Sequence, residues 1–294
     1  MNKSPNQIII VFLGTPAFAA TILEVLVNSP YRPSLVITEP DKFVGRQQQL
    51  TPSAVKLMAE RHNLPVVQPA SAAELQATLE QAGADLGIVA AYGRILTGQM
   101  LASARQGFLN VHASLLPAHR GATPIQAAIL AGDPETGVTI MQINEGLDTG
   151  PIVSWAPLAI EETATAEDLT ELLAELGGQL LIETLPDYLD CSIVSQAQPA
   201  TTTPVSKRLT RESGQLTGQE KPEQVLRMLR AYHPWPGVWL EIEAQRVILF
   251  AAHLKDCRLV PDQLQLAGKN PVDWLTFHRD RPELAKKIIE FFKN

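Results

Sequence analysis

The 294-residue chain is long enough for about two domains, and its 45% hydrophobic content is sufficient to fill two cores. Its formal charge of -7 argues at first against a protein that holds nucleic acid phosphates. That charge is divided unevenly, because residues 1–206 hold 9 basic and 20 acidic residues whereas residues 207–294 hold 15 basic and 11 acidic ones. An acidic part beside a mildly basic part indicates that the two have different partners.

The sequence shows no strong sign of export or of a membrane span. Cys191 and Cys257 form no C-x-x-C pair and suggest neither a disulfide framework nor a thiolate metal site. The apolar run over residues 8–13 is shorter than a usual signal-peptide core, so a secretory signal is the weaker alternative. No stretch approaches the roughly 20 apolar residues that cross a bilayer. We expect a cytoplasmic protein with no membrane partner.

Strand-like and helix-like segments alternate along the first part of the chain. The expected strands are apolar runs rich in β-branched residues, at 8–13, 35–38, 66–67, 86–91 and 108–112, with a further β-rich run at 138–143. The expected helices are 16–27, 51–62, 72–81, 124–130 and 167–187. Thr51 and Pro52 are the expected cap and first residue of the second helix. This alternation is typical of a Rossmann-like α/β domain with a mostly parallel sheet.

Two segments between these elements are irregular. Residues 39–50 are expected to form an extended polar loop, and residues 113–123 follow the strand at 108–112. Ligands of open parallel sheets bind beyond the carboxyl ends of the strands. We therefore expect the chemistry in the second of these segments.

A change of composition marks a domain boundary. Residues 195–206 contain two prolines, three consecutive threonines and no charge, which indicates a linker. A helix at 222–232 and short strands at 238–242 and 246–251 follow it, as in a small β-barrel. The predicted organisation is a catalytic domain over 1–194, a linker over 195–206 and a C-terminal domain over 207–294.

The familiar phosphate and nucleophile motifs are missing. Gly14-Thr15-Pro16 lacks the later glycines of G-x-G-x-x-G, and neither a P-loop nor a G-x-S-x-G elbow occurs. His112, His119 and Asp148 could suggest zinc, but the two histidines are seven positions apart, with Pro117 between them. No helical face can therefore bring the histidines onto one ion, and we expect no metal site.

Asn110 and His112 stand out at the end of an expected strand. Alternate residues of a strand point to the same face, so the amide and the imidazole would project together. Such a pair can donate hydrogen bonds to a developing oxyanion and move a proton. Asp148 lies between two glycines that allow a tight turn, and its carboxylate would favour the charged imidazole. Singly each residue has an ordinary structural explanation, but the combination indicates a site.

These residues lie within longer motifs. They are NVHASLLPAHRGATPIQAAILAGD over 110–133, TGVTIMQINEGLDTGP over 136–151, and PWPG over 234–237. Together the motifs resemble the methionyl-tRNA formyltransferases, within the wider group of enzymes that take a formyl group from 10-formyltetrahydrofolate. The resemblance extends over nearly the whole chain. It implies a Rossmann-like formyltransferase domain followed by a small OB-like β-barrel.

The resemblance also implies residue roles and partners. The catalytic residues would be Asn110, His112 and Asp148, and the folate contacts would come from Ser114, Leu115, Leu116 and Pro117. The activity would be transfer of a formyl group to methionine on initiator methionyl-tRNA, in the initiation of protein synthesis. The formyl donor is a co-substrate, and neither a metal nor a covalent enzyme intermediate is required. We expect a monomer.

The expected tRNA contacts depart from the family pattern. The long loop keeps Lys42 and Arg46 but carries glutamines at 47–49 where relatives usually have glycine and lysine. Residues 216–218 also differ from the family's Ile-Asp-Trp element. Two alternatives therefore stay open: a formyltransferase for an amino sugar nucleotide, and a non-catalytic module that binds folate or RNA.

Overall fold

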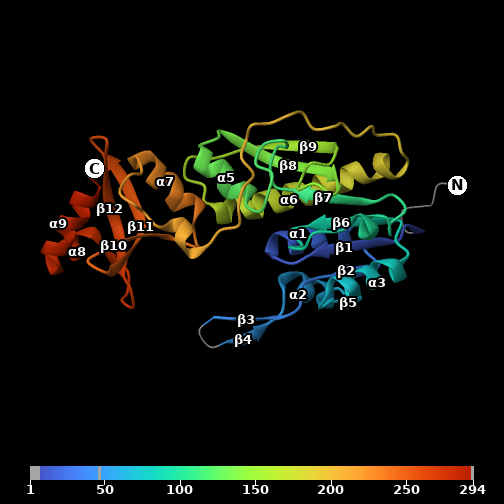
Figure 1. Ribbon diagram of the computed structural model, residues 1–294, viewed down its shortest axis with the longest axis horizontal. Coiled ribbons are helices and arrows are strands. Elements are labelled where there is room, and N and C mark those ends of the chain that lie inside the picture. The colour runs from blue at the N-terminus through green and yellow to red at the C-terminus, as the bar shows by residue number, and fades with distance from the viewer. Residues whose placement is uncertain (1–6, 46–47, 293–294) are drawn as a thin grey trace. The chain divides into compact units, whose positions relative to one another are not determined.

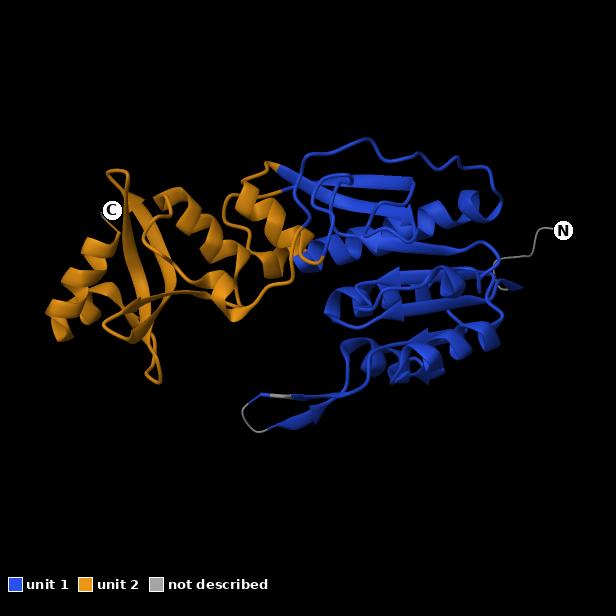
Figure 2. Cartoon of the chain, viewed as in Figure 1, with its two compact units in different colours: residues 1–121, 135–159, 170–205 blue, residues 122–134, 160–169, 206–294 orange. Residues whose placement is uncertain are grey.

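The chain forms two compact units, which Figure 2 distinguishes by colour. The computed structural model describes residues 7–45 and 48–292. The first unit comprises residues 1–121, 135–159 and 170–205, and the second comprises 122–134, 160–169 and 206–294. The second unit thus includes two segments that lie within the predicted catalytic domain. One of them holds helix α5 (Pro124–Ala131), which contacts helix α7 (Pro222–Ala231).

A seven-stranded sheet forms the centre of the first unit, in the order β5-β2-β1-β6-β7-β8-β9. Its strands are β1 (Ile10–Gly14), β2 (Leu35–Ile37), β5 (Val66–Val67), β6 (Leu86–Ala90), β7 (Phe108–His112), β8 (Glu135–Gln142) and β9 (Ile152–Ala159). The pairs from β5 to β7 are parallel, whereas β8 and β9 are antiparallel to their neighbours. The predicted mostly parallel sheet is confirmed.

Helices cover both faces of this sheet (Figure 1). They are α1 (Ala17–Val27), α2 (Ala54–Arg61), α3 (Ala72–Ala82), α4 (Gly98–Leu101) and α6 (Ala166–Leu189), the last of which begins in the second unit. Leu75 and Leu79 of α3 and Met100 of α4 pack with alternate residues of β1 in one buried cluster. On the other face, a side chain at Gly177 of α6 would come within 2.8 Å of Val111 in β7. Glycine there lets α6 lie close against the strand, although it is a poor helix former.

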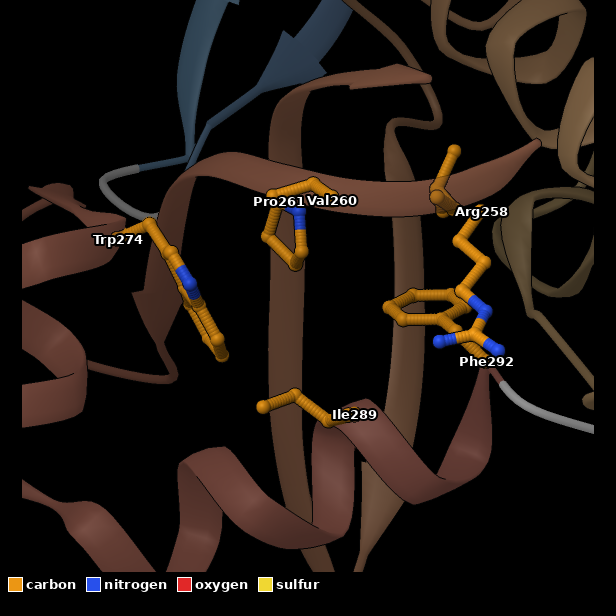
Figure 3. Close-up of a pocket in the computed structure, with 7 residues that line it drawn as sticks. Arg258, Val260, Pro261, Trp274, Ile289 and Phe292 are labelled. Atoms are coloured by element: carbon orange, nitrogen blue, oxygen red, sulfur yellow. The ribbon is translucent and has the colours of Figure 1, made fainter. Parts of the chain in front are cut away.

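The second unit contains an antiparallel sheet in the order β10-β11-β12-β13. Its strands are β10 (Val238–Ile242), β11 (Gln245–Lys255), β12 (Arg258–Leu266) and β13 (Val272–Asp273). They are accompanied by α5, α7, α8 (Trp274–Asp280) and α9 (Pro282–Phe291). A hollow of about 200 Å³ lies among Arg258, Leu259, Val260, Pro261, Trp274, Ile289 and Phe292 (Figure 3). The predicted small β domain after the α/β domain is confirmed.

Two local predictions were wrong. The segment expected as a polar loop contains a hairpin, with β3 (Lys42–Val44) antiparallel to β4 (Gln49–Thr51). Thr51 therefore belongs to a strand and does not cap the next helix. The cap of α2 is Ser53, whose hydroxyl accepts a hydrogen bond from the Lys56 amide at 3.0 Å.

Within the described residues, no helix is both long and apolar enough to span a membrane.

Candidate active site

The end of β7 carries Asn110 and His112 on one face of the strand, as predicted. Asn110 is half-buried, and the His112 side chain is 6% exposed. The intervening Val111 faces α6, where Gly177 allows the close approach described above. The amide and the imidazole are thus presented from a strand that is packed firmly on its opposite face.

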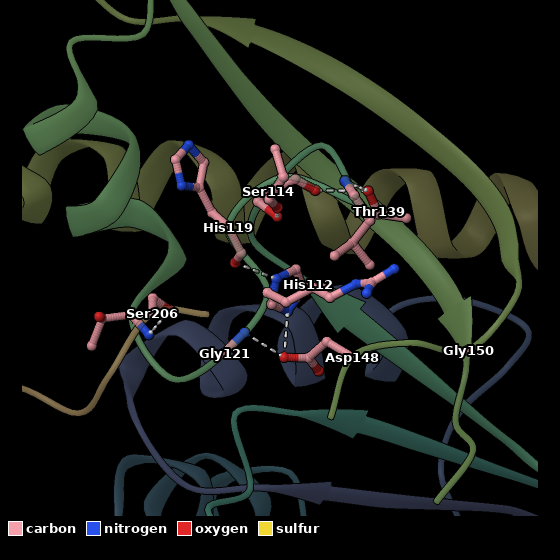
Figure 4. Close-up of polar contacts among 12 residues, drawn as sticks. His112, Ser114, His119, Gly121, Thr139, Asp148, Gly150 and Ser206 are labelled. Carbon is pink, nitrogen blue, oxygen red and sulfur yellow. Dashed lines mark hydrogen bonds and ion pairs between the residues drawn. The ribbon is translucent and has the colours of Figure 1, made fainter. Parts of the chain in front are cut away.

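Both ring nitrogens of His112 face oxygen atoms (Figure 4). Nε2 lies 3.2 Å from the carbonyl oxygen of His119, and since a carbonyl only accepts, Nε2 carries the hydrogen. Nδ1 lies 3.8 Å from Oδ2 of Asp148, which is too far for a hydrogen bond. The imidazole is therefore oriented by a backbone carbonyl and faces a carboxylate across a short gap.

Burial decides the protonation of His112. It lowers the pKa of the imidazole below its ordinary value, and the opposing effects of Asp148 and of the bond to His119 do not offset it. The carboxylate is not bonded to the ring, so it compensates only part of the cost of a buried cation. The lowered pKa favours the neutral imidazole, with a lone pair on Nδ1, over the charged form expected from the sequence.

Asp148 lies in a tight turn, as its flanking glycines suggest. Its φ of 51° is in the left-handed region, which aspartate tolerates better than most residues. A side chain at Gly150 would come within 1.7 Å of the Gln142 carbonyl oxygen, so the turn lies directly against the end of β8. The carboxylate Oδ2 accepts a hydrogen bond from the Gly121 amide at 2.8 Å. Asn110 and His112 thus come from β7, and Asp148 comes from the segment between β8 and β9. All three residues lie in the first unit.

The segment 114–117 is fixed by internal hydrogen bonds. Ser114 is fully buried, and its hydroxyl donates to the Ala118 carbonyl at 2.6 Å. The hydroxyl of buried Thr139 donates to the Ser114 carbonyl at 2.7 Å and accepts from the Leu116 amide at 3.1 Å. The expected folate segment therefore exposes little of Ser114 and Leu116, whereas Leu115 and Pro117 are half-buried.

Gln198 is a site residue that sequence reasoning missed. It lies in the segment predicted to be a linker, yet its Nε2 donates to the carbonyl oxygens of Asp148 at 2.9 Å and Gly150 at 2.7 Å. Its Oε1 accepts from Nε of Arg120 at 2.9 Å and from Nη2 at 2.6 Å. Because two of its four hydrogen bonds go to backbone carbonyls and the other two go to the distant Arg120, no spacing in the sequence could have pointed to it.

Of the expected tRNA contacts, Lys42 lies in strand β3 of the hairpin. Lys42 is exposed and lies 3.3 Å from the Glu39 carboxylate, whereas Arg46 lies outside the described residues. Phe43 and Leu50 pair across the hairpin and are 66% and 55% exposed. Sequence reasoning passed over both residues because nothing in their spacing distinguishes an exposed apolar pair from a buried one.

A polar network holds the base of this hairpin. The Lys56 ammonium donates to the Asp41 carboxylate at 2.7 Å, and Gln68 donates to the same carboxylate at 2.7 Å. The bond from Lys56 is the main reason that the pKa of Asp41 lies below its usual value. Arg94 forms an ion pair with Glu39, which lies two residues before Asp41. The hairpin thus projects from a fixed base.

The arrangement suits transfer of an acyl group to an amine. An amide, a neutral imidazole with a free lone pair and a carboxylate lie within one unit, beyond the end of a central strand. The amide can stabilise an oxyanion, and the imidazole can accept a proton. In the described part of the chain, no group of three or more His, Cys, Asp or Glu side chains is placed to hold a metal ion.

Family models match both parts of the chain. Residues 6–185 match the model described as formyl transferase, and residues 208–258 match the formyl transferase C-terminal domain. A methionyl-tRNA formyltransferase from Pseudomonas savastanoi pv. phaseolicola is 40% identical over 89% of this chain and 84% of that protein. One from Halorhodospira halophila is 44% identical over 83% of this chain and 79% of that protein.

Solved structures share the fold at low identity. An N-formyltransferase from Helicobacter canadensis, in complex with folinic acid and dTDP-3-aminofucose, has a TM-score of 0.63 and 18% identity, over 89% of this chain and 96% of that one. Methionyl-tRNA formyltransferase from Clostridium thermocellum has a TM-score of 0.60 and 14% identity, over 90% of this chain and all of that one. These identities establish the fold only. The matches to both family models and the sequence relatives go further, and they establish that this chain belongs to the methionyl-tRNA formyltransferase family.

Proposed function

We propose that this protein transfers the formyl group of 10-formyltetrahydrofolate to the amino group of methionine on initiator methionyl-tRNA. The observation that carries the proposal is the buried imidazole of His112, which lies 3.8 Å from the Asp148 carboxylate at the end of the strand that also presents Asn110. Relatives at 40–44% identity that bear the name of this activity support the choice of substrate.

The reaction exchanges one carbon–nitrogen bond for another. The methionine amine attacks the formyl carbon, and the Asn110 amide donates to the developing oxyanion. Nδ1 of His112 accepts a proton from the attacking nitrogen, and the imidazolium that forms lies between the His119 carbonyl and the Asp148 carboxylate. That proton then moves to the departing folate nitrogen. Formylmethionyl-tRNA and tetrahydrofolate leave, and the protein returns to its starting state.

The residues after β7 fit a folate. A flat pterin ring needs apolar surface with a few fixed polar groups. Leu115 and Pro117 offer half-buried apolar surface, while Ser114 and Thr139 hold the segment in place. We assign the folate contacts to Leu115, Pro117 and the backbone of the segment, and a positioning role to Ser114.

The tRNA would be held by exposed cations. Lys42 projects from the fixed hairpin, and the residues from 207 onward carry the basic excess of the chain. We expect phosphate contacts from both, with Arg46 as a further candidate.

A comparison of two acceptors tests the proposal. The protein is incubated with 10-formyltetrahydrofolate and either methionyl initiator tRNA or a dTDP-linked amino sugar, and formylated product is quantified. We expect turnover with the tRNA alone. Turnover of the sugar alone would identify an amino sugar nucleotide formyltransferase, and folate binding without turnover of either acceptor would indicate a non-catalytic module.

A further inference from the structure

The side chain of Gln198 connects two parts of the candidate active site. All four of its hydrogen-bonding positions are occupied, two by the Arg120 guanidinium and two by the carbonyls of Asp148 and Gly150. A fully bonded, half-buried amide is held in one conformation. Gln198 therefore fixes the distance between the loop after β7 and the turn over residues 146–150.

The partners also fix which way the amide points. Arg120 has only donors, so the Gln198 oxygen must face it. The turn presents only carbonyl oxygens, so the NH₂ group must face the turn. The reverse orientation would place donors against donors and oxygen against oxygen. Arg120 thus orients Gln198, and Gln198 in turn holds the backbone of the residue that carries the carboxylate.

The turn needs such a tether. Asp148 has a left-handed backbone conformation, and its carboxylate reaches Gly121 and His112 from the edge of the unit. A displacement of about 1 Å in a catalytic group can reduce a rate about 100-fold. We propose that Gln198, oriented by Arg120, is a positioning residue that keeps the Asp148 carboxylate beside His112 during formyl transfer. This inference rests on the proposed function.

Gln198→Glu tests the inference with little change of shape. One oxygen of the new carboxylate can still accept from Arg120, but the other faces two carbonyl oxygens and repels the turn. We expect kcat for formylation to fall about 10- to 100-fold, while KM for 10-formyltetrahydrofolate stays within about twofold. We also expect faster hydrogen exchange of the amides at 146–150 with unchanged exchange in β1 and β6. A general loss of stability would accelerate exchange in those strands as well.

Gln196→Glu is the matched control. Gln196 lies two residues earlier, its side chain is exposed, and its backbone pairs with Ile152. We expect kcat and the exchange rates of the amides at 146–150 to stay within twofold of the unchanged protein. Gln198→Ala removes the tether without adding repulsion, so it gives a milder second test if the glutamate variant does not fold.

The outcomes separate the inference from the function on which it rests. Unchanged exchange at 146–150 in both Gln198 variants, or unchanged kcat in a folded Gln198 variant, would overturn the positioning role. If the unchanged protein formylates neither acceptor, the proposed function is contradicted instead. The exchange measurement then still decides whether Gln198 holds the turn.

Discussion

The candidate active site and the basic C-terminal part use polar side chains in opposite ways. Around β7, polar groups are buried or half-buried and bonded to specific backbone atoms, as in Ser114 and Asp148. After residue 206, the ion pairs Arg279–Asp280 and His253–Asp262 lie at the surface. Exposed pairs contribute little stability, whereas a buried group fixes geometry. The site should therefore depend on single atoms, and tRNA binding on summed charge.

The largest expected effect is loss of the Asp148 charge. Asp148→Asn keeps an oxygen that can accept from Gly121, but it no longer stabilises an imidazolium at His112. We expect kcat for formylation to fall about 10²- to 10⁴-fold, with binding of 10-formyltetrahydrofolate nearly unchanged, as measured by steady-state kinetics and calorimetry.

Glu145→Gln, at the residue just before this turn, provides a control for Asp148→Asn. Glu145 is an exposed carboxylate three residues earlier, so its neutralisation changes net charge equally without touching His112. We expect activity within twofold of the unchanged protein. Equal losses of activity in both variants would mean that the active site responds to net charge, as tRNA binding by the basic part should. The active site and the basic part would then not differ in how they use charged side chains.

Salt should affect the two substrates unequally. If two or three phosphates are contacted, raising salt from 50 to 200 mM should weaken tRNA binding about 10- to 40-fold through counterion uptake. Binding of 10-formyltetrahydrofolate should change far less, because it depends on apolar surface and short hydrogen bonds. Affinities measured across this salt range would reveal the difference, and a flat response for tRNA would contradict charge-based binding.

The strand and helix alternation and the position of the site were accessible from the sequence. Apolar runs and the polar end of residues 108–112 predict β7 and its two candidate side chains, because strand geometry alone places Asn110 and His112 on one face. The sequence could not give the protonation of His112, since that depends on burial by distant residues.

Other features left no pattern in the sequence. Strand β9 went unpredicted because it is an edge strand that contains Pro157 and exposes Trp155. The β3–β4 hairpin has its apolar residues outside the core, so periodicity gave no signal. Gln198 bonds to carbonyl groups that every residue possesses. Sequence reasoning thus predicts the helices and strands whose side chains are buried at regular intervals. It misses contacts that depend on hydrogen bonds between residues distant in the sequence.

A single hairpin charge should have a small effect. Lys42→Ala removes one expected phosphate contact, so we predict that the salt slope of tRNA binding falls by about one and that affinity drops severalfold. Titration of labelled tRNA at several salt concentrations measures both. Arg105→Ala is the control, because this exposed cation precedes β7 at the strand's amino end and pairs with Asp85. A slope unchanged by Lys42→Ala would remove the hairpin from the tRNA contacts.

The smallest expected effect is the pH dependence of stability that burial of His112 creates. The pKa of the His112 imidazole is lower in the folded protein than in the unfolded chain, where it is about 6.5. At pH values between these two pKa values, the unfolded chain therefore binds more protons than the folded protein. Stability from this group is therefore present above about pH 6.5 and is lost as the pH falls through the folded-state pKa. His112→Gln has no such group, and its Tm should fall less between pH 7.5 and pH 5 than that of the unchanged protein. The two proteins differ only at residue 112, so the difference isolates His112, and each kcal/mol corresponds to about 2–4 °C in a unit of this size. If Tm falls equally with pH in the two proteins, burial does not lower the pKa of His112. The imidazole would then behave like the exposed groups of the surface ion pairs in the basic part.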